Sequence, residues 1–215
     1  MKLFSRISAA MKFAATGRLS ASAFEGAMQN RRLIAWKATQ ENINSLLASG
    51  GDLLRARARQ IVRSNPYASN AADSFVANAV GAGIVPSSLL TDAALKDELQ
   101  RVWLAWTDEA DADDLTDFYG LQAVAARAMF EAGECFVRFR PRRPEDGLTV
   151  PLQLQLLESE HLPFEKNEIG TNGNQIRCGV EFDKIGRRVA YHFYRKHPGD
   201  ATDQSSKGEI VRVPA

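Results

Sequence analysis

The residues best suited to covalent chemistry are one cysteine and three histidines. Cys135 could act as a thiol nucleophile if His161 or His192 supplied a base within hydrogen-bond reach. Cys135 alternates with apolar residues, however, and this pattern favours a small buried hydrophobe over a reactive thiol. His161, His192 and His197 do not have the spacing of metal ligands. These residues therefore indicate neither a convincing nucleophile nor a metal centre.

Two groups of carboxylates are the next candidates. Glu158 and Glu160 lie two residues apart at the end of a predicted strand and could do acid–base work, but no third acid or histidine stands at a persuasive spacing. The run Asp111-Ala112-Asp113-Asp114 suggests calcium binding. An EF-hand loop would then need glycine at 116 and glutamate at 122, where the chain has Thr116 and Gln122. The run is therefore interpreted as a solvated acidic loop.

Phosphate-binding loops are the third possibility. Gly81-Ala82-Gly83 follows a predicted helix, whereas a dinucleotide-binding turn must follow a strand, open a helix and carry a third glycine. The chain has no G-x-x-x-x-G-K-[ST] motif. We therefore expect no cofactor, no metal and no enzymatic activity, although a small hydrolase using Cys135 or the Glu158/Glu160 pair stays as an alternative. The absence of a catalytic constellation favours a binding or structural protein.

Composition excludes several other classes. The 215 residues are 45% hydrophobic and 25% charged, which is typical of a globular chain. Two cysteines are too few for a disulfide scaffold, and no apolar run is long enough to span a membrane.

The net charge of +1 conceals a strong asymmetry along the chain. Residues 1–63 carry 11 Lys/Arg against 3 Asp/Glu, residues 64–134 carry 3 against 12, and residues 135–215 carry 13 against 11. Such a division favours complementarity within or between subunits, or nucleic-acid contact by the basic third.

Hydrophobic periodicity predicts helices first and strands afterwards. Residues 31–47 show a weakly helical pattern that Gly50-Gly51 is expected to break. Helices are then expected over 52–63 with Asp52 as the cap, from Pro66 to about Val80, from Thr91 and Asp92 onward, and to Gly133 from a cap at Thr116 or Asp117. Strands are expected over 135–140, 152–156, 176–182, 188–195 and 209–213, with a hairpin between the third and fourth. The order predicts an α+β fold with a mostly antiparallel sheet, incomplete at the C-terminus.

The predicted organisation has three parts. We expect residues 1–30 to form a mobile basic N-terminal arm, residues 31–133 a helical part, and residues 134–215 a β-rich part.

Three arginines form a column on the first predicted helix. Arg55, Arg59 and Arg63 repeat at i, i+4, and like charges at this spacing repel each other. Something acidic should therefore face them: the 108–117 segment with Asp111, Asp113 and Asp114, a neighbouring subunit, or phosphate. These six residues are the candidate subunit or DNA contacts.

Seven stretches occur in an order typical of one family. They are Arg57–Ala68 (RARQIVRSNPYA), Ala79–Pro86 (AVGAGIVP), Trp103–Trp106 (WLAW), Ala132–Arg138 (AGECFVR), Leu154–Leu162 (LQLLESEHL), Gly179–His192 with its GVEFD, GR and AYH pieces, and Arg212–Ala215 (RVPA). Together they resemble motifs of the lambda-type family of tailed-phage portal proteins, over roughly residues 30–215.

The resemblance implies a dodecameric ring at one capsid vertex. Such a ring is the channel for double-stranded DNA, the docking point for terminase and the tail connector, and the nucleus of capsid assembly. It is located in the virion, after assembly in the host cytoplasm, and is not itself an enzyme. The portion present corresponds to the N-terminal arm and wing, and we expect the chain to end before the stem, clip and crown. The alternatives are a nucleic-acid-binding module that uses the basic N-terminal third, and a non-functional prophage remnant of a portal.

Overall fold

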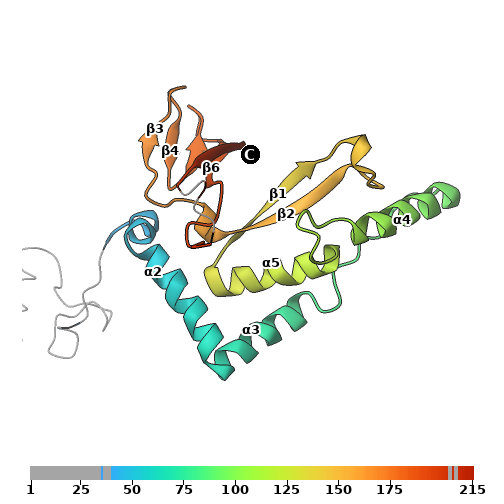
Figure 1. The fold of residues 1–215 in the computed structure, drawn as a ribbon, viewed down its shortest axis with the longest axis horizontal. Helices are drawn as coiled ribbons and strands as arrows, with labels where there is room; N and C mark the ends of the chain where they lie inside the picture. The colour runs from blue at the N-terminus through green and yellow to red at the C-terminus, as the bar shows by residue number, and fades with distance from the viewer. Residues whose placement is uncertain (1–34, 36–39, 203–204, 206–207) are drawn as a thin grey trace, which may run out of the picture. The chain divides into compact units, whose positions relative to one another are not determined.

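The computed structural model describes residue 35 and residues 40–202, 205 and 208–215. The chain divides into two units, 1–41 and 42–215, and the account below concerns the second (Figure 1). The predicted N-terminal arm over residues 1–30 lies outside the described residues. Among the helices that are described, none combines the length and the apolar character needed to cross a membrane.

Helix α2 (Ile43–Ser64) passes without interruption through Gly50-Gly51. The expected break there, with a cap at Asp52, is therefore wrong: the helix is capped ten residues earlier, where the Asn42 side chain accepts a hydrogen bond from the backbone of Asn44. A glycine costs a helix only about 1 kcal/mol, which tertiary packing can offset. Gly51 supplies such packing, because a Cβ at this position would lie 2.7 Å from the ring of Phe164.

The remaining helices begin where the sequence indicated, and the expected ends near Val80 and at Gly133 are confirmed. Asn65 ends α2 and caps α3 (Pro66–Ala79), with Pro66 in its first turn. Asp92 caps α4 (Ala93–Asp108) and Asp117 caps α5 (Phe118–Ala132), each by accepting a backbone N–H. Gly133, with φ of 85°, ends α5. Helix α5 packs against α2, α3 and the strands that follow it.

The first strands form a long antiparallel pair over α5. Strand β1 (Cys135–Pro141) pairs with β2 (Leu152–Glu158), and the short helix η2 (Pro144–Asp146) lies in their connection. On its other edge, β2 is bridged by the 110–112 segment, where Leu154 exchanges backbone hydrogen bonds with Ala110 and Ala112. Trp106 fixes α4 to the same strand by donating its indole N–H to the carbonyl of Leu152 at 2.7 Å.

A second, five-stranded antiparallel sheet completes the unit. After the short helix η3 (Ser159–His161), the strands follow the chain in order: β3 (Glu168–Ile169), β4 (Gln175–Arg177), β5 (Val180–Phe182), β6 (Arg188–Tyr194) and β7 (Ile210–Pro214). The predicted single strand over 176–182 is two strands, because Cys178 and Gly179 both have positive φ and form a tight turn. The hairpin over 183–187 and the final strand are confirmed, and the described elements agree with the predicted α+β class.

One apolar cluster joins the two sheets. Leu162, Phe164 and Phe193 are buried at its centre. Phe136 of β1 packs on Phe193 and Tyr191 of β6, with ring centroids 5.0 and 5.9 Å apart. The loop after β2 is therefore held between helix α2 and the five-stranded sheet.

Candidate functional site

The arginine column of α2 divides into one buried, one partly buried and one exposed residue. Arg55 is 7% exposed, forms an ion pair with Asp52, and stacks its guanidinium 4.4 Å from the ring centre of Phe164. Arg59 donates to Glu160 at 2.9 Å and lies 3.4 Å from Glu158. Arg63 is exposed and forms no ion pair with any residue that the structure describes.

The acidic partner of Arg59 within the chain is thus the end of β2. The expectation that the 108–117 acids would face this column within a subunit is wrong for Arg59. Sequence periodicity could show that the column needed acids, but 101 residues separate Arg59 from Glu160. Only the turn of η3 brings the two glutamates to α2. A contact of Arg63 with a neighbouring subunit or with phosphate stays a prediction.

Asp111 has a structural task inside the acidic loop. It is 5% exposed, and its carboxylate accepts hydrogen bonds from the backbone N–H groups of Asp113, Leu115 and Thr116 at 3.0, 3.0 and 3.1 Å. Asp113 and Asp114 are exposed on the loop that Asp111 organises. The surface charge of this loop therefore comes from the residues after Asp111, and their role as contacts stays a prediction.

Glu158 and Glu160 meet two histidines as well as Arg59. Single ligand atoms of Glu158, Glu160 and His197 come within 4.8 Å of one another, and the rings of His161 and His197 are in edge contact at 5.5 Å. The spacing of these residues in the sequence gave no sign of this convergence. His197 Nε2 lies 3.2 Å from Glu158 Oε2 without the geometry of a hydrogen bond. Arg59 pairs with both carboxylates, so the cluster is an ion-pair network, although the single guanidinium balances only one of the two negative charges.

The pKa values in this network follow from burial and charge. Burial tends to raise the pKa of Glu160, but its own backbone N–H and the charges of Arg59 and Arg55 outweigh burial and lower it. Burial lowers the pKa of His161, and the neighbouring His197 lowers it further. Glu160 is therefore a carboxylate bound to arginine, which makes it a poor general acid.

Cys135 and His192, the pair considered for thiol chemistry, are each engaged elsewhere. The Cys135 thiol lies 3.7 Å from the carbonyl of Ala125 in α5, and burial, followed by the charge of Glu134, raises its pKa. His192 Nε2 is 3.1 Å from the carboxylate of Glu181. A raised thiol pKa opposes nucleophilic activation, so the geometry does not support a cysteine hydrolase.

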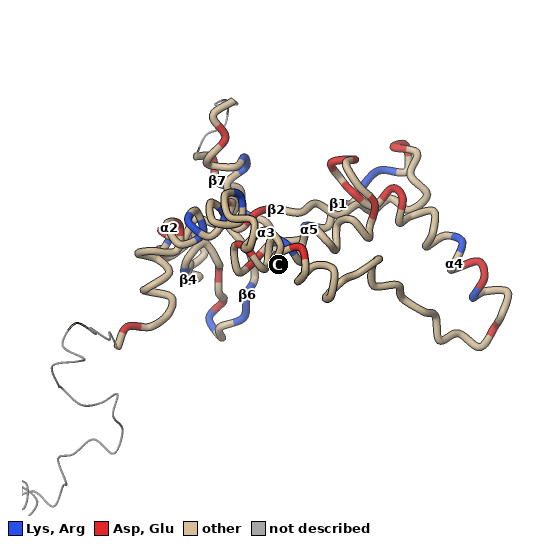
Figure 2. Tube along the Cα trace, turned by 90° about the horizontal axis from the view of Figure 1, so that it is seen from below, with Lys and Arg blue, Asp and Glu red and all other residues tan. Residues whose placement is uncertain are grey.

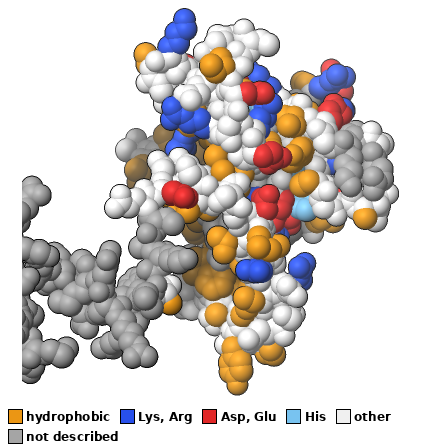
Figure 3. All heavy atoms as spheres, turned by 90° about the vertical axis from the view of Figure 1, so that its left-hand side faces the viewer, with side chains coloured by type: hydrophobic (Ala, Val, Ile, Leu, Met, Phe, Trp, Pro, Cys, Tyr) orange, Lys and Arg blue, Asp and Glu red, His pale blue; other side chains and the backbone are white. Residues whose placement is uncertain are grey.

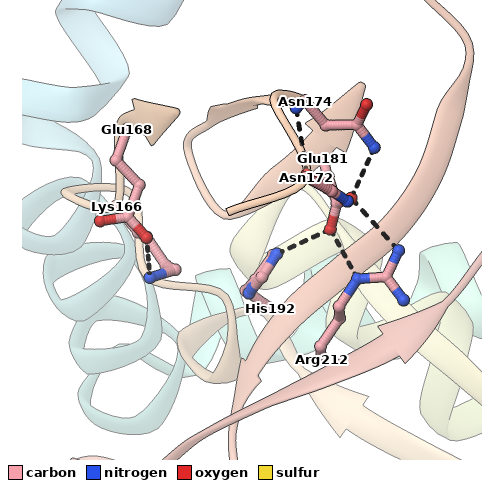
Figure 4. A network of polar contacts seen from close by, with 7 residues as sticks. All are labelled: Lys166, Glu168, Asn172, Asn174, Glu181, His192 and Arg212. Carbon is pink, nitrogen blue, oxygen red and sulfur yellow. Dashed lines mark hydrogen bonds and ion pairs between the residues drawn. The ribbon is translucent and has the colours of Figure 1, made fainter. Parts of the chain in front are cut away.

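Glu181 is the central hydrogen-bond acceptor of the five-stranded sheet (Figure 4). Its side chain is 2% exposed, and it accepts hydrogen bonds from Arg212 at 2.7 and 3.2 Å and from Asn172 and Asn174 at 2.8 Å each. These hydrogen bonds, led by that of Arg212, lower the pKa of Glu181 far below its ordinary value. The network ties strand β7 and the 170–174 turn to the centre of the sheet, and sequence patterning had predicted only a strand there.

A cavity of about 650 Å³ opens between α2 and the five-stranded sheet. Its wall is mainly apolar and includes Leu47, Gly51, Phe164 and Tyr191. Its charged lining residues are Arg55, Glu131, Glu134, Arg177 and Arg188. Burial raises the pKa of Glu134, although the charge of Arg55 opposes this shift. Figure 3 shows hydrophobic side chains gathered near the centre of this side of the unit, with charged side chains around them.

The glycine pair that could have bound phosphate forms a turn after α3. Gly81 and Gly83 both have positive φ, at 59° and 111°. A Cβ at Gly83 would lie 2.3 Å from the ring of Tyr119, and Gln122 bonds both backbone groups of Ile84. These glycines serve the packing of the 80–85 segment on α5.

Comparison with known proteins agrees with this picture of a structural unit. The family model described as phage portal protein, lambda family, matches residues 29–215. The chain is also similar to the probable portal protein of Halomonas phage phiHAP-1, with 27% identity over 203 residues. The match covers 89% of this chain and 39% of that relative, so the chain spans well under half of the relative's length. Because the family model covers most of the sequence, the chain belongs to the lambda family of phage portal proteins.

Proposed function

We propose that this chain is the wing part of a portal subunit, repeated around a ring at one vertex of a phage capsid. The observation that carries the proposal is the family match over residues 29–215. In this role the chain contributes to the channel through which DNA enters and leaves the capsid, and to the platform on which terminase and tail proteins dock. The role is structural, which fits the engagement of Cys135 and Glu160 in packing and ion pairs.

The distribution of charge supports a head-to-tail interface. Exposed acids gather at the end of the unit that carries α4 and the 108–117 loop, whereas Arg57 and Arg63 are exposed on α2 (Figure 2). Opposite charges at two different surfaces suit a ring, because each copy offers one surface to the other surface of its neighbour.

The N-terminal half of α4 supports the same interface. Every residue from 93 to 101 is exposed, and the side chains of Leu95 and Leu99 are 54% and 49% exposed. A solvent-exposed apolar stripe is typical of a surface that binds a partner protein.

Native mass spectrometry of the 215-residue chain across concentration tests the proposal, with negative-stain images of any oligomer. We expect ring-shaped oligomers, twelve subunits by family resemblance. Replacing Asp113 and Asp114 by Lys should weaken them, and adding Arg57→Glu and Arg63→Glu should restore them. A chain that stays monomeric at high concentration, or that oligomerises without responding to these charges, would contradict the interface.

A nucleic-acid-binding module that uses the basic N-terminal third is the second candidate. It is favoured by the 11 Lys/Arg against 3 Asp/Glu in residues 1–63. A dedicated module of this kind should bind DNA at sub-micromolar concentration with a steep salt dependence, and should lose that binding when residues 1–41 are removed.

A further inference from the structure

One face of the β1–β2 pair carries a row of arginines that the proposed function does not use. Arg138 and Arg140 lie opposite Gln155 and Gln153 in the register, and Arg142 follows two residues later. Successive residues on one face of a strand are about 6.5 Å apart. All three side chains are partly exposed, and none forms an ion pair with a residue in the described part of the chain.

The glutamines opposite this row accept hydrogen bonds from arginines of the row. Because glutamine is neutral, these hydrogen bonds do not cancel the arginine charge. Gln153 donates its amide hydrogens to the carbonyls of Glu109 and Asp111 at 2.8 and 2.9 Å, which turns its own carbonyl oxygen toward Arg142 Nε at 2.8 Å. Gln155 Oε1 lies 3.5 Å from Arg140 Nη1. A guanidinium has five N–H donors, so most of the donors on the row stay available for a ligand.

The two acidic residues whose carbonyls bond Gln153 use their carboxylates within the loop. The Glu109 carboxylate accepts the backbone N–H of Thr149 at 2.8 Å. The Asp111 carboxylate is used by the backbone of its own turn. Burial, followed by the charge of Arg140, lowers the pKa of Arg138. Among the described residues, no carboxylate therefore forms an ion pair with an arginine of the row.

We infer that Arg138, Arg140 and Arg142 form a contact for the sugar–phosphate backbone of double-stranded DNA. Evenly spaced guanidinium groups suit a polymer with evenly spaced phosphates, to which arginine donates in bidentate fashion. A protein partner fits less well, because between Phe136 and the end of β1 this face offers Arg and Gln without the apolar or aromatic anchor typical of protein interfaces. Phosphate contacts of this kind do not read sequence, as passage of a whole genome requires. The inference takes DNA as the relevant polymer from the proposed function, but it does not depend on ring formation.

Fluorescence anisotropy with short DNA duplexes of two unrelated sequences tests the inference on the full 215-residue chain. Affinity is measured between about 50 and 200 mM salt, where each lost phosphate contact makes the log–log salt slope less steep by about 1. The variant Arg138→Gln/Arg140→Gln/Arg142→Gln should flatten the slope by about 2–3 for both duplexes. The matched control Arg101→Gln/Arg187→Gln/Arg195→Gln removes the same charge from arginines that are paired with Glu98, Asp183 and Glu209, and it should leave the slope close to that of the unmodified chain.

A single isosteric change gives a second test that does not remove any arginine. Gln155→Glu places a carboxylate opposite Arg138 and beside Arg140, so it should raise the thermal midpoint of unfolding or leave it unchanged while flattening the salt slope by 1 or more.

Equal flattening of the salt slope in the arginine variant and its control, or tight DNA binding by the Gln155→Glu variant, would overturn the inference. So would an arginine variant that loses oligomers in native mass spectrometry but keeps its salt slope, because the row would then be a subunit contact. A chain that forms no ring but shows the expected slopes would refute the proposed ring alone.

Discussion

Arg59 and Glu160 lie 101 residues apart in the chain, yet their side chains meet at 2.9 Å. Arg59 belongs to α2 and Glu160 to the turn that follows β2, so the contact links the helical and β-rich parts of one subunit. The two side chains are 19% and 21% exposed. Water screens such a pair only partly, and the contact should therefore contribute to stability more than an ordinary surface ion pair does.

Charge reversal at this contact should destabilise the chain. Arg59→Glu places a third carboxylate beside Glu158 and Glu160, and we expect a loss of about 2–4 kcal/mol in the free energy of unfolding. Urea denaturation followed by far-ultraviolet circular dichroism measures it. Arg57→Glu, on the exposed side of the same helix, is the control and should change stability by less than about 0.5 kcal/mol. Equal effects of the two reversals would show that the contact carries no special energy.

The buried carboxylate of Glu181 should make the stability of the chain depend on pH. Glu181→Gln keeps the shape but removes the charge that Arg212 and His192 face, and it should cost about 2–4 kcal/mol at pH 7. The folded pKa of Glu181 lies far below the ordinary 4.5, so its contribution is complete above about pH 4.5 and is lost as the pH falls toward the folded pKa. The stability gap between the unmodified chain and the variant should therefore narrow below pH 4.5.

Urea midpoints at pH 7, pH 5 and below pH 4.5 check this dependence. The control is Glu168→Gln, which removes an exposed carboxylate paired with Lys166 and should leave the midpoint at pH 7 unchanged. A gap between the unmodified chain and Glu181→Gln that stayed constant on acidification would show that Glu181 is not the group that titrates.

The starts of α3, α4 and α5 were predictable because their signals are local, whereas the start of α2 was not. Asn65, Asp92 and Asp117 each place an oxygen where it accepts an orphan backbone N–H, and Gly133 supplies the left-handed residue that ends α5. The tight turn at Cys178-Gly179 was missed, because a cysteine with positive φ is not a typical turn signal and an apolar run on either side resembles one strand. Sequence periodicity reports which face is buried, and it does not report where a chain reverses.

The polar site was much less predictable. That Arg59 needed an acidic partner could be inferred from the column of like charges, but the partner depends on where η3 turns. Asp111 looked like a surface charge because its neighbours are acidic, and only the loop conformation shows that its carboxylate holds backbone N–H groups. The role of such residues depends on long-range contacts, which a local pattern does not contain.

The two tryptophans of α4 should respond differently to the same substitution. Both pack with Phe118, at ring distances of 5.2 and 5.3 Å, but Trp106 donates its N–H to Leu152 whereas the Trp103 N–H is buried without a partner. An unmade buried hydrogen bond is costly, so losing the indole N–H costs less at 103 than at 106. We expect Trp106→Phe to lose about 1–2 kcal/mol more than Trp103→Phe. Thermal and urea unfolding measure the difference, and a larger loss at Trp103 would contradict the assigned packing.

The adjacent glycines of α2 should respond to alanine with opposite signs. A Cβ at Gly50 would meet nothing within 4 Å, so Gly50→Ala should stabilise the chain by about 0.5–1 kcal/mol through higher helix propensity and a less flexible unfolded state. A Cβ at Gly51 would lie 2.7 Å from the Phe164 ring, which also stacks on Arg55, so Gly51→Ala should destabilise by about 1–3 kcal/mol. The two variants differ only in position, and their urea midpoints should fall on either side of that of the unmodified chain. If both were stabilising, α2 would not pack on Phe164 as closely as the structure has it, because a free helix gains from either alanine.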